Sequence, residues 1–436
     1  MEPTKIGLLG YGHVGAGVAK IVCQDEDLLR HKLGWPIRLV KAVVRNLEGK
    51  RGFPPPEGAL TTDFAQVVGN PEIEVVCELM GGLEPARRLV LEALAAGQHV
   101  VTANKALLAV HGPEIFSKAA EVGREVMFEA AVAGGLPVIK TLKEGLAANR
   151  IESVYGILNG TTNYILTRMA RDGLAFQTAL AEAQQAGYAE ADPSSDVDGF
   201  DAAYKLSILT ALAYGRLPRL QDIHIEGISA LEPEDFAFAA EYGRTLKLLT
   251  VASLGDDGRL EVRLHPSLLP SGHMLAGVGG ALNAVMIRGH ASGDIFLSGA
   301  GAGMMPTASA VVSDVIEAAR VLRASGSHRP PLLGWKGLES ADVAAVKPMA
   351  EVRTSYYLRL TVKDRLRVLA SISGVLGDHN ISIAQAIQKG LQGAQEVVSL
   401  ALWTHTALES DLQAALAELR SMEVVADARV IRVENF

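Results

Sequence analysis

The sequence has few cysteines and no long apolar run, and both shortages exclude classes of protein. Among its 436 residues only Cys23 and Cys77 are cysteines, and they form no Cys-x-x-Cys pair. This usage suits a reducing compartment and offers no thiolate metal site. No uninterrupted apolar stretch reaches the about 18 residues that a membrane-spanning helix needs. We therefore expect a cytoplasmic chain that does not enter a membrane.

A strong net charge is also missing. The 41 basic and 49 acidic residues give a formal net charge of −8, which argues against general affinity for nucleic acid or for an anionic membrane. Hydrophobic residues make up 49% of the chain, so a sizeable core can form without disulfides or a metal. We expect a globular protein whose partners are small molecules.

The order of apolar runs predicts several regions. Residues 1–135 alternate short apolar runs with helix-like segments, which is typical of a Rossmann-type, doubly wound parallel sheet. Residues 136–305 have the mixed pattern of an α+β region, and an amphipathic helix over 306–323 is expected to pack back on the first domain. Residues 324–351 have the composition of a linker. Residues 352–436 follow the βαββαβ order of a ferredoxin-like fold.

A glycine-rich motif follows the first predicted strand. It consists of Gly10, Tyr11, Gly12, His13, Val14 and Gly15. In a strand–turn–helix context, the first glycine permits a tight turn, the second admits a pyrophosphate, and the third lets the helix pack closely. The motif predicts a dinucleotide site, and a glycine-rich turn without ligand is the alternative.

The end of the second predicted strand bears on the choice of cofactor. A residue that binds the ribose 2′-hydroxyl of NAD would be Asp or Glu at this position. This chain has Arg45 instead, and Lys50 and Arg51 follow shortly after it. A guanidinium suits a 2′-phosphate, so NADP is favoured over NAD. The alternative is that Arg45 is a surface residue or stacks on adenine without discriminating, so NAD stays open.

An acid-rich stretch ends in a lysine at residue 205. Its carboxylates are Glu190, Asp192, Asp196, Asp198 and Asp201. A calcium loop starting at Ser194 would need a bidentate Glu at its twelfth position, which is Lys205, so that interpretation fails. Asp201 and Lys205 lie one helical turn apart, which also fits an ordinary salt bridge.

Carbonyl reduction gives this stretch another interpretation. The reaction needs a proton for the developing alkoxide, which the ammonium of Lys205 can supply. An amino-acid substrate carries its own ammonium, which suits Glu190 and Asp201. Lys105 follows a predicted strand and is placed to reach the cleft at the carboxyl ends of the sheet, although a solvated lysine is the alternative.

Six motifs together resemble the homoserine dehydrogenase family. They are GLLGYGHVGAGV, TANK, EAAVAGGLP, GILNGTTNYIL, GYAEADPSSDVDGFDAAYK and GAGAGMMPTASAVVSDV, in the family's order over residues 4–325. The tail after residue 352 resembles an ACT domain, a small-molecule sensor. No kinase-like region precedes the nucleotide motif, so the chain resembles the monofunctional form.

The resemblance implies an activity and a set of site residues. The family reversibly reduces L-aspartate 4-semialdehyde to L-homoserine with NAD(P)H, in threonine, methionine and isoleucine biosynthesis. Its proton donor and acceptor falls on Lys205. Other implied positions are Lys105 at cofactor and substrate, Glu190 and Asp201 at substrate, Gly187 at both, Thr102 and Ala103 beside the nicotinamide ribose, and Gly301 and Gly303 at the cofactor.

The resemblance also implies a cation site, a regulator and an assembly. Backbone carbonyls would hold a monovalent cation such as Na⁺, at Glu129, Val132, Gly134 and Leu136. Asn380 matches a position that reads an amino-acid effector, for which threonine is the natural candidate. Residues 364–369 differ from the usual Asp-x-Pro-Gly-Val-Leu turn of ACT domains, because Leu and Arg stand in place of Pro and Gly. The region 136–305 would bind substrate and dimerise. ACT domains commonly pair side by side through strand edges, so a homodimer or homotetramer is expected.

Two other classes of function remain to be weighed. A semialdehyde dehydrogenase that acts through a thiohemiacetal needs an activated cysteine. Cys77 falls in an apolar strand and Cys23 in the first helix, so neither is well placed. An amino-acid sensor that uses the nucleotide domain as a redox switch would not need Glu190, Asp201 and Lys205 together.

Overall fold

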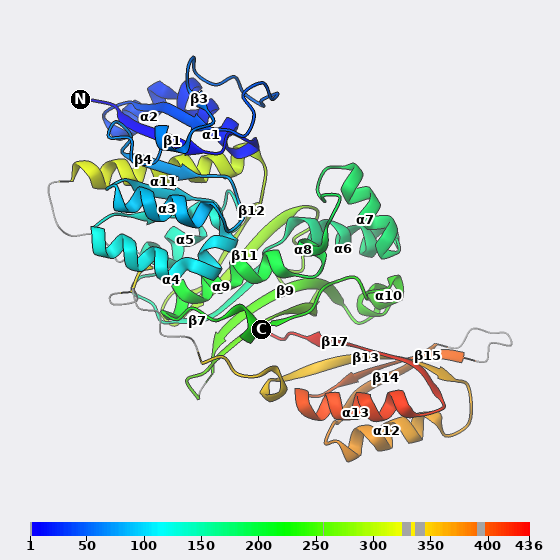
Figure 1. Cartoon of the computed structure of the whole chain (residues 1–436). Helices are drawn as coiled ribbons and strands as arrows, with labels where there is room; N and C mark the ends of the chain where they lie inside the picture. Colours follow the sequence, from blue (N-terminus) through cyan, green and yellow to red (C-terminus); the bar gives the residue numbers. More distant parts are fainter. Residues whose placement is uncertain (1, 256, 325–332, 336–344, 390–396) are drawn as a thin grey trace. The chain divides into compact units, whose positions relative to one another are not determined.

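The polypeptide divides into two units that are interleaved along the chain. The computed structural model describes residues 2–255, 257–324, 333–335, 345–389 and 397–436 (Figure 1). The first unit consists of Met1–Gly160, Asp201–Gln221 and Ala281–Ala344, and the second of Thr161–Phe200, Asp222–Gly280 and Ala345–Phe436. Most of the predicted linker lies outside the described residues. In the described part of the chain, no helix is long and apolar enough to cross a membrane.

A six-stranded parallel sheet forms the nucleotide-binding part of the first unit. Its order is β3-β2-β1-β4-β5-β6. The strands are β1 (Thr4–Leu9), β2 (Ile37–Val43), β3 (Leu60–Thr61), β4 (Val75–Glu78), β5 (His99–Thr102) and β6 (Val126–Met127). Every residue of β4 and β5 is buried, as expected for central strands covered on both faces. This strand order confirms the predicted Rossmann-type sheet.

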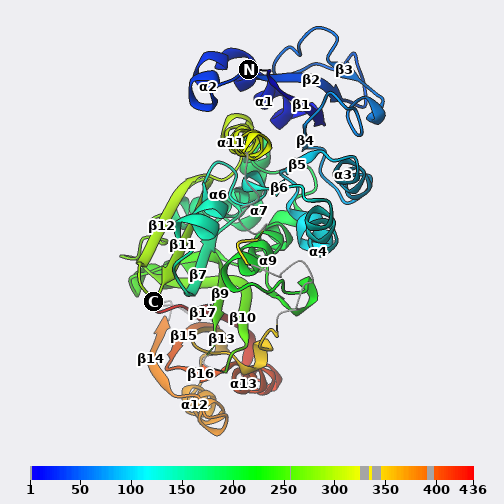
Figure 2. The same cartoon turned by 90° about the vertical axis from the view of Figure 1, so that its left-hand side faces the viewer.

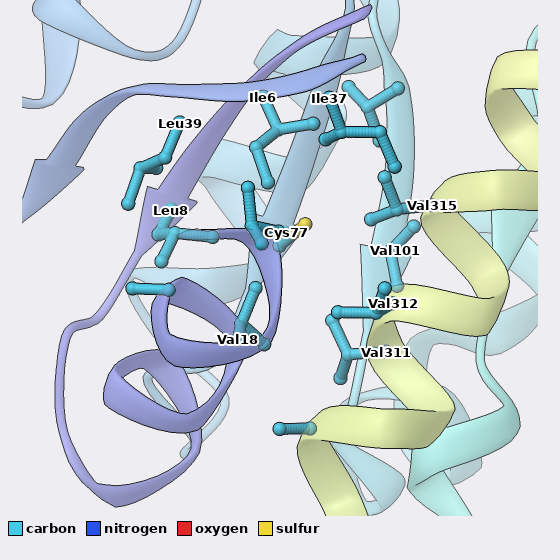
Figure 3. Close-up of a cluster of buried hydrophobic side chains, with 14 of the residues drawn as sticks. Ile6, Leu8, Val18, Ile37, Leu39, Cys77, Val101, Val311, Val312 and Val315 are labelled. Carbon is cyan, nitrogen blue, oxygen red and sulfur yellow. The ribbon is translucent and has the colours of Figure 1, made fainter. Parts of the chain in front are cut away.

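Helices from distant parts of the sequence cover this sheet. They are α1 (His13–Gln24), α2 (Glu26–Leu33), α3 (Ala86–Ala95), α4 (Lys105–Val122) and α11 (Met304–Arg323). Figure 3 shows Val311, Val312 and Val315 of α11 facing side chains of the sheet, including Cys77 and Val101. The late helix therefore contributes to the core of the N-terminal domain, because its valines recur at helical spacing on one buried face.

A second, antiparallel group of strands completes the first unit. It comprises β7 (Ile151–Ile157), β11 (Leu282–Gly289) and β12 (Gly293–Ala300), with β11 paired to both others. The other helical elements are α5 (Val138–Lys140), α9 (Phe200–Tyr214), the π-helix Thr141–Gly145 and the short 3₁₀ segments Phe64–Gln66, Glu129–Ala131 and Leu220–Asp222. Helix α9 is buried over almost its whole length, so even its polar side chains lie in the interior.

The second unit contains a long hairpin and a ferredoxin-like subdomain. Its strands are β8 (His224–Ile225), β9 (Arg244–Leu254), β10 (Leu260–Pro270), β13 (Arg353–Lys363), β14 (Ile383–Lys389), β15 (Val397–Thr404), β16 (Ala407–Leu408) and β17 (Val425–Val433). Its helices are α6 (Gly160–Asp172), α7 (Phe176–Gln185), α8 (Ser194–Val197), α10 (Pro233–Glu241), α12 (Val368–Asp378) and α13 (Glu409–Ser421), with a 3₁₀ turn at Met349–Glu351.

The C-terminal strands confirm the predicted βαββαβ fold. Their order is β17-β13-β15-β14, and α12 and α13 lie on the same face of this sheet (Figure 2). Strand β17 also pairs in parallel with β10, through Ser267↔Arg432 and Leu268↔Val433. This pairing joins the subdomain to β10 through the backbone. The Arg432 side chain is buried and binds Glu409 with two hydrogen bonds, of 3.0 and 2.6 Å.

Strand β9 carries a buried lysine whose titration affects stability. Lys247 Nζ donates to Asn163 Oδ1 at 3.2 Å and to the Val278 carbonyl at 2.5 Å, and burial lowers its pKa to about 8. In the unfolded chain a lysine titrates near pH 10.4. Between these values the unfolded state binds more protons than the folded state, so the free energy of unfolding rises with pH.

We expect Lys247→Met to remove this pH dependence. Relative to the variant, the wild type should gain about 1.5 kcal/mol in the free energy of unfolding between pH 8 and 9.5. Urea unfolding of both proteins at several pH values in this range measures the difference. Parallel curves for the two proteins would contradict a lysine that is charged below pH 8 and neutral above it.

Candidate active site

One buried carboxylate lies between two ammonium groups in the first unit. Asp201, in the first turn of α9, accepts from Lys205 Nζ at 2.6 Å and from Asn159 Nδ2 at 2.8 Å through Oδ2. Its other oxygen, Oδ1, is 3.1 Å from Lys105 Nζ. The Asp201 and Lys205 side chains are only 10% and 11% exposed. The pair is therefore not the solvated helix salt bridge that the spacing also allowed.

The charge on Asp201 is stabilised by its neighbours. Burial raises the pKa of this carboxyl, but the ammonium groups of Lys205 and Lys105 and the hydrogen bonds outweigh burial and hold the pKa well below its usual range. Asp201 is therefore ionised at neutral pH. With two lysines and one carboxylate, the cluster has a net charge of +1 when both lysines are protonated.

Lys205 has a fixed position and a spare donor. Its Nζ also donates to the Leu158 carbonyl, just after β7, at 2.7 Å. Among the described residues, Asp201 and Leu158 are its hydrogen-bond partners, so the third N–H of the ammonium is left for a ligand. An ammonium held in this way can give a proton to a bound oxygen or, when neutral, take one.

Lys105 is held by hydrogen bonds at the turn between β5 and α4. Asn104 caps α4, because its Oδ1 accepts from the backbone N–H of Leu107 at 3.1 Å. The backbone N–H of Asn104 in turn donates to Thr102 Oγ1 at 3.0 Å. Lys105 is the first residue of the helix. These hydrogen bonds therefore fix the backbone from which its side chain extends.

A glutamate that the sequence analysis missed supports this turn. Thr102 Oγ1 donates to Glu78 Oε2 at 2.7 Å, and Glu78 Oε1 accepts from the backbone of Met80 at 2.9 Å and Gly81 at 3.2 Å. Glu78 is fully buried, and burial raises its pKa although these bonds oppose the shift. The sequence does contain a sign of this role, because Glu78 is a carboxylate at the end of an apolar strand, where ligands approach a parallel sheet.

The glycine-rich loop has the shape that a dinucleotide requires. Gly10 has a φ of +107°, and a Cβ there would lie 2.9 Å from the Leu79 carbonyl oxygen. A Cβ at Gly15 would lie 2.4 Å from the Gly10 carbonyl oxygen, whereas one at Gly12 would meet nothing within 4 Å. The space in front of Gly12, at the start of α1, suits a pyrophosphate. Tyr11 is buried, His13 is exposed and Val14 is partly buried.

The other predicted cofactor residues lie at the ends of β2 and β5 and at the start of α11. Arg45 is exposed and comes two residues after β2 ends. Thr102 is buried at the end of β5, and Ala103 follows it with partial exposure. Gly303 precedes α11 and has a φ of +115°. These placements fit a nicotinamide dinucleotide along the carboxyl ends of the strands.

Two side-chain carboxylates accept hydrogen bonds from the backbone around the predicted cation loop. The Glu129 carboxylate accepts from the backbone of Ile139 at 2.8 Å and Lys140 at 3.0 Å, and Asp314 Oδ2 accepts from the Glu129 N–H at 2.7 Å. Val132, Gly134 and Leu136 follow along the loop. No cluster of three or more His, Cys, Asp or Glu side chains suited to a metal occurs among the described residues. The carbonyl site stays a prediction.

Two predicted site residues belong to the second unit. Gly187 has a φ of +76° and open space around it. Glu190 is exposed, and its carbonyl accepts from Gln184 Nε2 at 3.1 Å. Nearby, Asp192 Oδ1 accepts from the backbone and hydroxyl of Ser194 at 3.1 and 2.7 Å, so Asp192 shapes the loop.

The predicted effector region contains a strained turn. Arg367 stands where the ACT pattern has glycine and has a φ of +71°, a left-handed conformation that side chains disfavour. The adjacent Leu366 is 96% exposed. A cavity of about 560 Å³ is lined by 362–370, Ser373, Gln388 and Leu400. Asn380 is exposed, has a φ of +60° and is not among these described lining residues.

Neither cysteine is set up as a nucleophile. Cys77 is fully buried in β4, and burial raises the pKa of its thiol. Cys23 is exposed on α1, and its pKa is also raised, by desolvation and by Glu26. A reactive cysteine needs the opposite shift, so neither residue supports oxidation through a thiohemiacetal.

Comparisons with known proteins agree with this arrangement. Family models match for the homoserine dehydrogenase NAD-binding domain over residues 10–129, for homoserine dehydrogenase over 137–316 and for the ACT domain over 356–424. The homoserine dehydrogenase of Pseudomonas aeruginosa is 43% identical over 438 residues and covers 100% of both chains. That of Neisseria gonorrhoeae is 42% identical, covering 100% of this chain and 99% of the relative.

Solved structures give the same result. A homoserine dehydrogenase from Thiobacillus denitrificans matches with a TM-score of 0.92 and 46% identity, covering 100% of this chain and 99% of that one. A hyperthermophilic archaeal homoserine dehydrogenase in complex with NADPH matches with a TM-score of 0.61 and 26% identity, over 75% of this chain and 100% of that one. The chain therefore belongs to the homoserine dehydrogenase family, oxidoreductases that act on CH–OH groups, and it has a nicotinamide-binding domain and a C-terminal ACT domain.

Proposed function

We propose that this chain reversibly reduces L-aspartate 4-semialdehyde to L-homoserine with NADPH, with Lys205 as general acid and base. The observation that carries the proposal is the ion cluster in which Asp201 pairs with both Lys205 and Lys105. The cluster lies beside strand ends in the unit that also holds the dinucleotide loop. Family membership supports the reaction, and the cluster supports the assignment of its proton donor.

Proton transfer follows from the position of Lys205. The hydride for the new C–H bond at the aldehyde carbon would come from a reduced nicotinamide when one is bound. The Lys205 ammonium gives its third proton to the developing alkoxide, so the O–H bond forms as an N–H bond breaks. In homoserine oxidation, neutral Lys205 takes the hydroxyl proton. Asp201 and the Leu158 carbonyl hold Nζ in place, and Lys105 adds positive charge near the oxygen.

Substrate and ion contacts complete the proposed site. Glu190 and Asp201 bind the ammonium group of the substrate, and Gly187 lies against both substrate and cofactor. Because both oxygens of Asp201 already pair with lysines, Glu190 is the carboxylate with more capacity for that ammonium. The proposed ligands of a monovalent cation are the carbonyls of Glu129, Val132, Gly134 and Leu136.

We assign NADP as the preferred cofactor. Exposed Arg45 at the end of β2 is suited to the 2′-phosphate, and the archaeal relative was solved with NADPH. Gly10, Tyr11, Gly12, His13, Val14 and Gly15 would hold the pyrophosphate, while Thr102, Ala103, Lys105 and Gly303 would flank the nicotinamide end. Oxidation of homoserine with NAD and NADP side by side tests the preference.

The reaction would serve threonine, methionine and isoleucine biosynthesis, with the enzyme in the cytoplasm. The ACT domain supports regulation by a small molecule, and we propose threonine as the feedback inhibitor, with Asn380 at the effector. A homodimer or homotetramer is the proposed assembly. The strained turn at Arg367 predicts weaker threonine binding than a turn with the usual Pro-Gly.

Replacing the proposed proton donor should abolish turnover. We expect Lys205→Met to lower kcat for homoserine oxidation by about 10²- to 10⁴-fold, because the variant has no group to accept the proton. Lys118→Met is the matched control, since the ammonium of Lys118 pairs with Glu121 on the surface of α4 at 2.7 Å. A folded Lys205→Met enzyme with near wild-type turnover would disprove the assignment.

The cofactor assignment predicts a selective effect at residue 45. We expect Arg45→Asp to lower kcat/KM with NADP about tenfold or more, because a charge-assisted hydrogen bond becomes a repulsion. The value with NAD should fall less or rise. Arg38→Asp, an exposed arginine near the start of β2, should leave the NADP/NAD ratio unchanged. Equal losses with both cofactors in Arg45→Asp would count against the 2′-phosphate contact.

The regulatory proposal predicts a gain of response when the turn is relaxed. Arg367→Gly should remove the cost of the left-handed conformation and open the turn where effectors approach. Half-inhibition of homoserine oxidation should then need less threonine than in the wild type, with valine as the control amino acid. If threonine inhibits neither enzyme, threonine is not the effector.

A further inference from the structure

Asn283 is a buried amide that shares an acceptor with the proposed proton donor. It lies near the start of β11 and is 1% exposed. Its Nδ2 donates to the Leu158 carbonyl at 2.9 Å, and the same carbonyl accepts from Lys205 Nζ at 2.7 Å. The Leu158 oxygen is therefore fixed from two sides. All three residues belong to the first unit.

The other end of this amide has no hydrogen-bond partner in the described part of the chain. Asn283 Oδ1 is buried without a hydrogen bond to any described residue, which is unfavourable for folding. An apolar side chain of similar size would avoid this penalty. Packing alone does not require an amide at this position. The function of the Asn283 side chain therefore lies in its Nδ2 group, which donates to the Leu158 carbonyl.

Glycines on neighbouring loops leave room for Asn283. A Cβ at Gly301 would lie 2.0 Å from Asn283 Cγ, so only glycine fits beside this amide. Gly134 packs in the same way on Gly301, since a Cβ there would lie 2.4 Å from the Gly301 carbonyl oxygen. The Gly135 N–H also donates to the Ala300 carbonyl at 3.1 Å. A continuous line of contacts thus runs from residue 134 through Gly301 and Asn283 to Leu158.

We infer that Asn283 is a positioning residue for proton transfer, and this rests on the proposed role of Lys205. By holding the Leu158 carbonyl, Asn283 sets the direction of one of the two hydrogen bonds that orient the Lys205 ammonium. It thereby directs the remaining N–H toward the substrate oxygen. Gly301 keeps Asn283 in this position, so the two glycine-rich loops are mechanically linked to the proton donor.

Two substitutions of Asn283 test the inference through different readouts. Asn283→Ala removes the donor and should lower kcat for homoserine oxidation about 10- to 100-fold, since small misplacements of a reacting group are costly, with little change in KM. Asn283→Asp places a carboxylate near the ammonium and favours its charged form. Because oxidation needs the neutral amine, the pH of half-maximal kcat/KM should rise by about one unit.

A matched control separates this from a general effect of the substitution. Asn149 lies at the opposite end of β11, where its Oδ1 accepts from the backbone of Ala291 and Ser292. Asn149→Asp makes the same chemical change away from Lys205 and should leave the pH profile where it is. A shift of equal size in Asn149→Asp would overturn the local explanation.

Gly301 supplies an independent test. In the wild type, Gly301→Ala should displace Asn283 and lower kcat, whereas in an Asn283→Ala background the added methyl has room and should lower kcat by a smaller factor. This non-additivity is the signature of direct contact. Additive losses, or folded Asn283 variants with wild-type kcat and pH profile, would overturn the role of Asn283.

The two proposals fail separately. If Lys205→Met is inactive while the Asn283 variants behave as the wild type, the general acid stands and the positioning role falls. If folded Lys205→Met remains active, the proposed proton donor itself falls, whatever the Asn283 variants show.

Discussion

The candidate site depends on the shared pairing of Asp201 with two lysines. A buried carboxylate or ammonium alone is strongly unfavourable, because the interior does not replace its hydration. Asp201 gives one oxygen to Lys205 and the other to Lys105, so each charge makes the others tolerable. The cluster keeps a net charge of +1 with both lysines protonated, which suits a site where an alkoxide develops.

This cluster explains why several distant segments must meet. Lys105 starts α4 after β5, Asn159 follows β7, and Asp201 and Lys205 occupy the first turns of α9. Each segment is held by buried hydrogen bonds, such as Thr102 to Glu78. Moving α4 or the segment after β7 would remove one of the partners of the buried Asp201 carboxylate, so the fold and the protonation state of the site depend on each other.

The sequence predicted the elements better than their contacts. Apolar periodicity and glycine spacing are local, so the parallel sheet, the dinucleotide loop and the βαββαβ subdomain followed from patterns within short windows. The bond from Asn159 to Asp201 and that from Asn283 to Leu158 join residues far apart in the chain. No local pattern marks them, and Glu78 was missed because its role depends on Thr102 of the next strand.

The turn at Arg367 shows that a fold can keep a backbone conformation after the residue that favours it is gone. Arg367 has a φ of +71° where the ACT pattern has glycine. The next residue, Val368, and Ile372 of α12 are buried in the subdomain core, so their packing fixes where the helix begins and imposes the turn before it. Ligand binding has no such support, since Leu366 and Arg365 point to solvent. We therefore expect the departure from the ACT pattern to leave the fold intact and to weaken the proposed response to an effector.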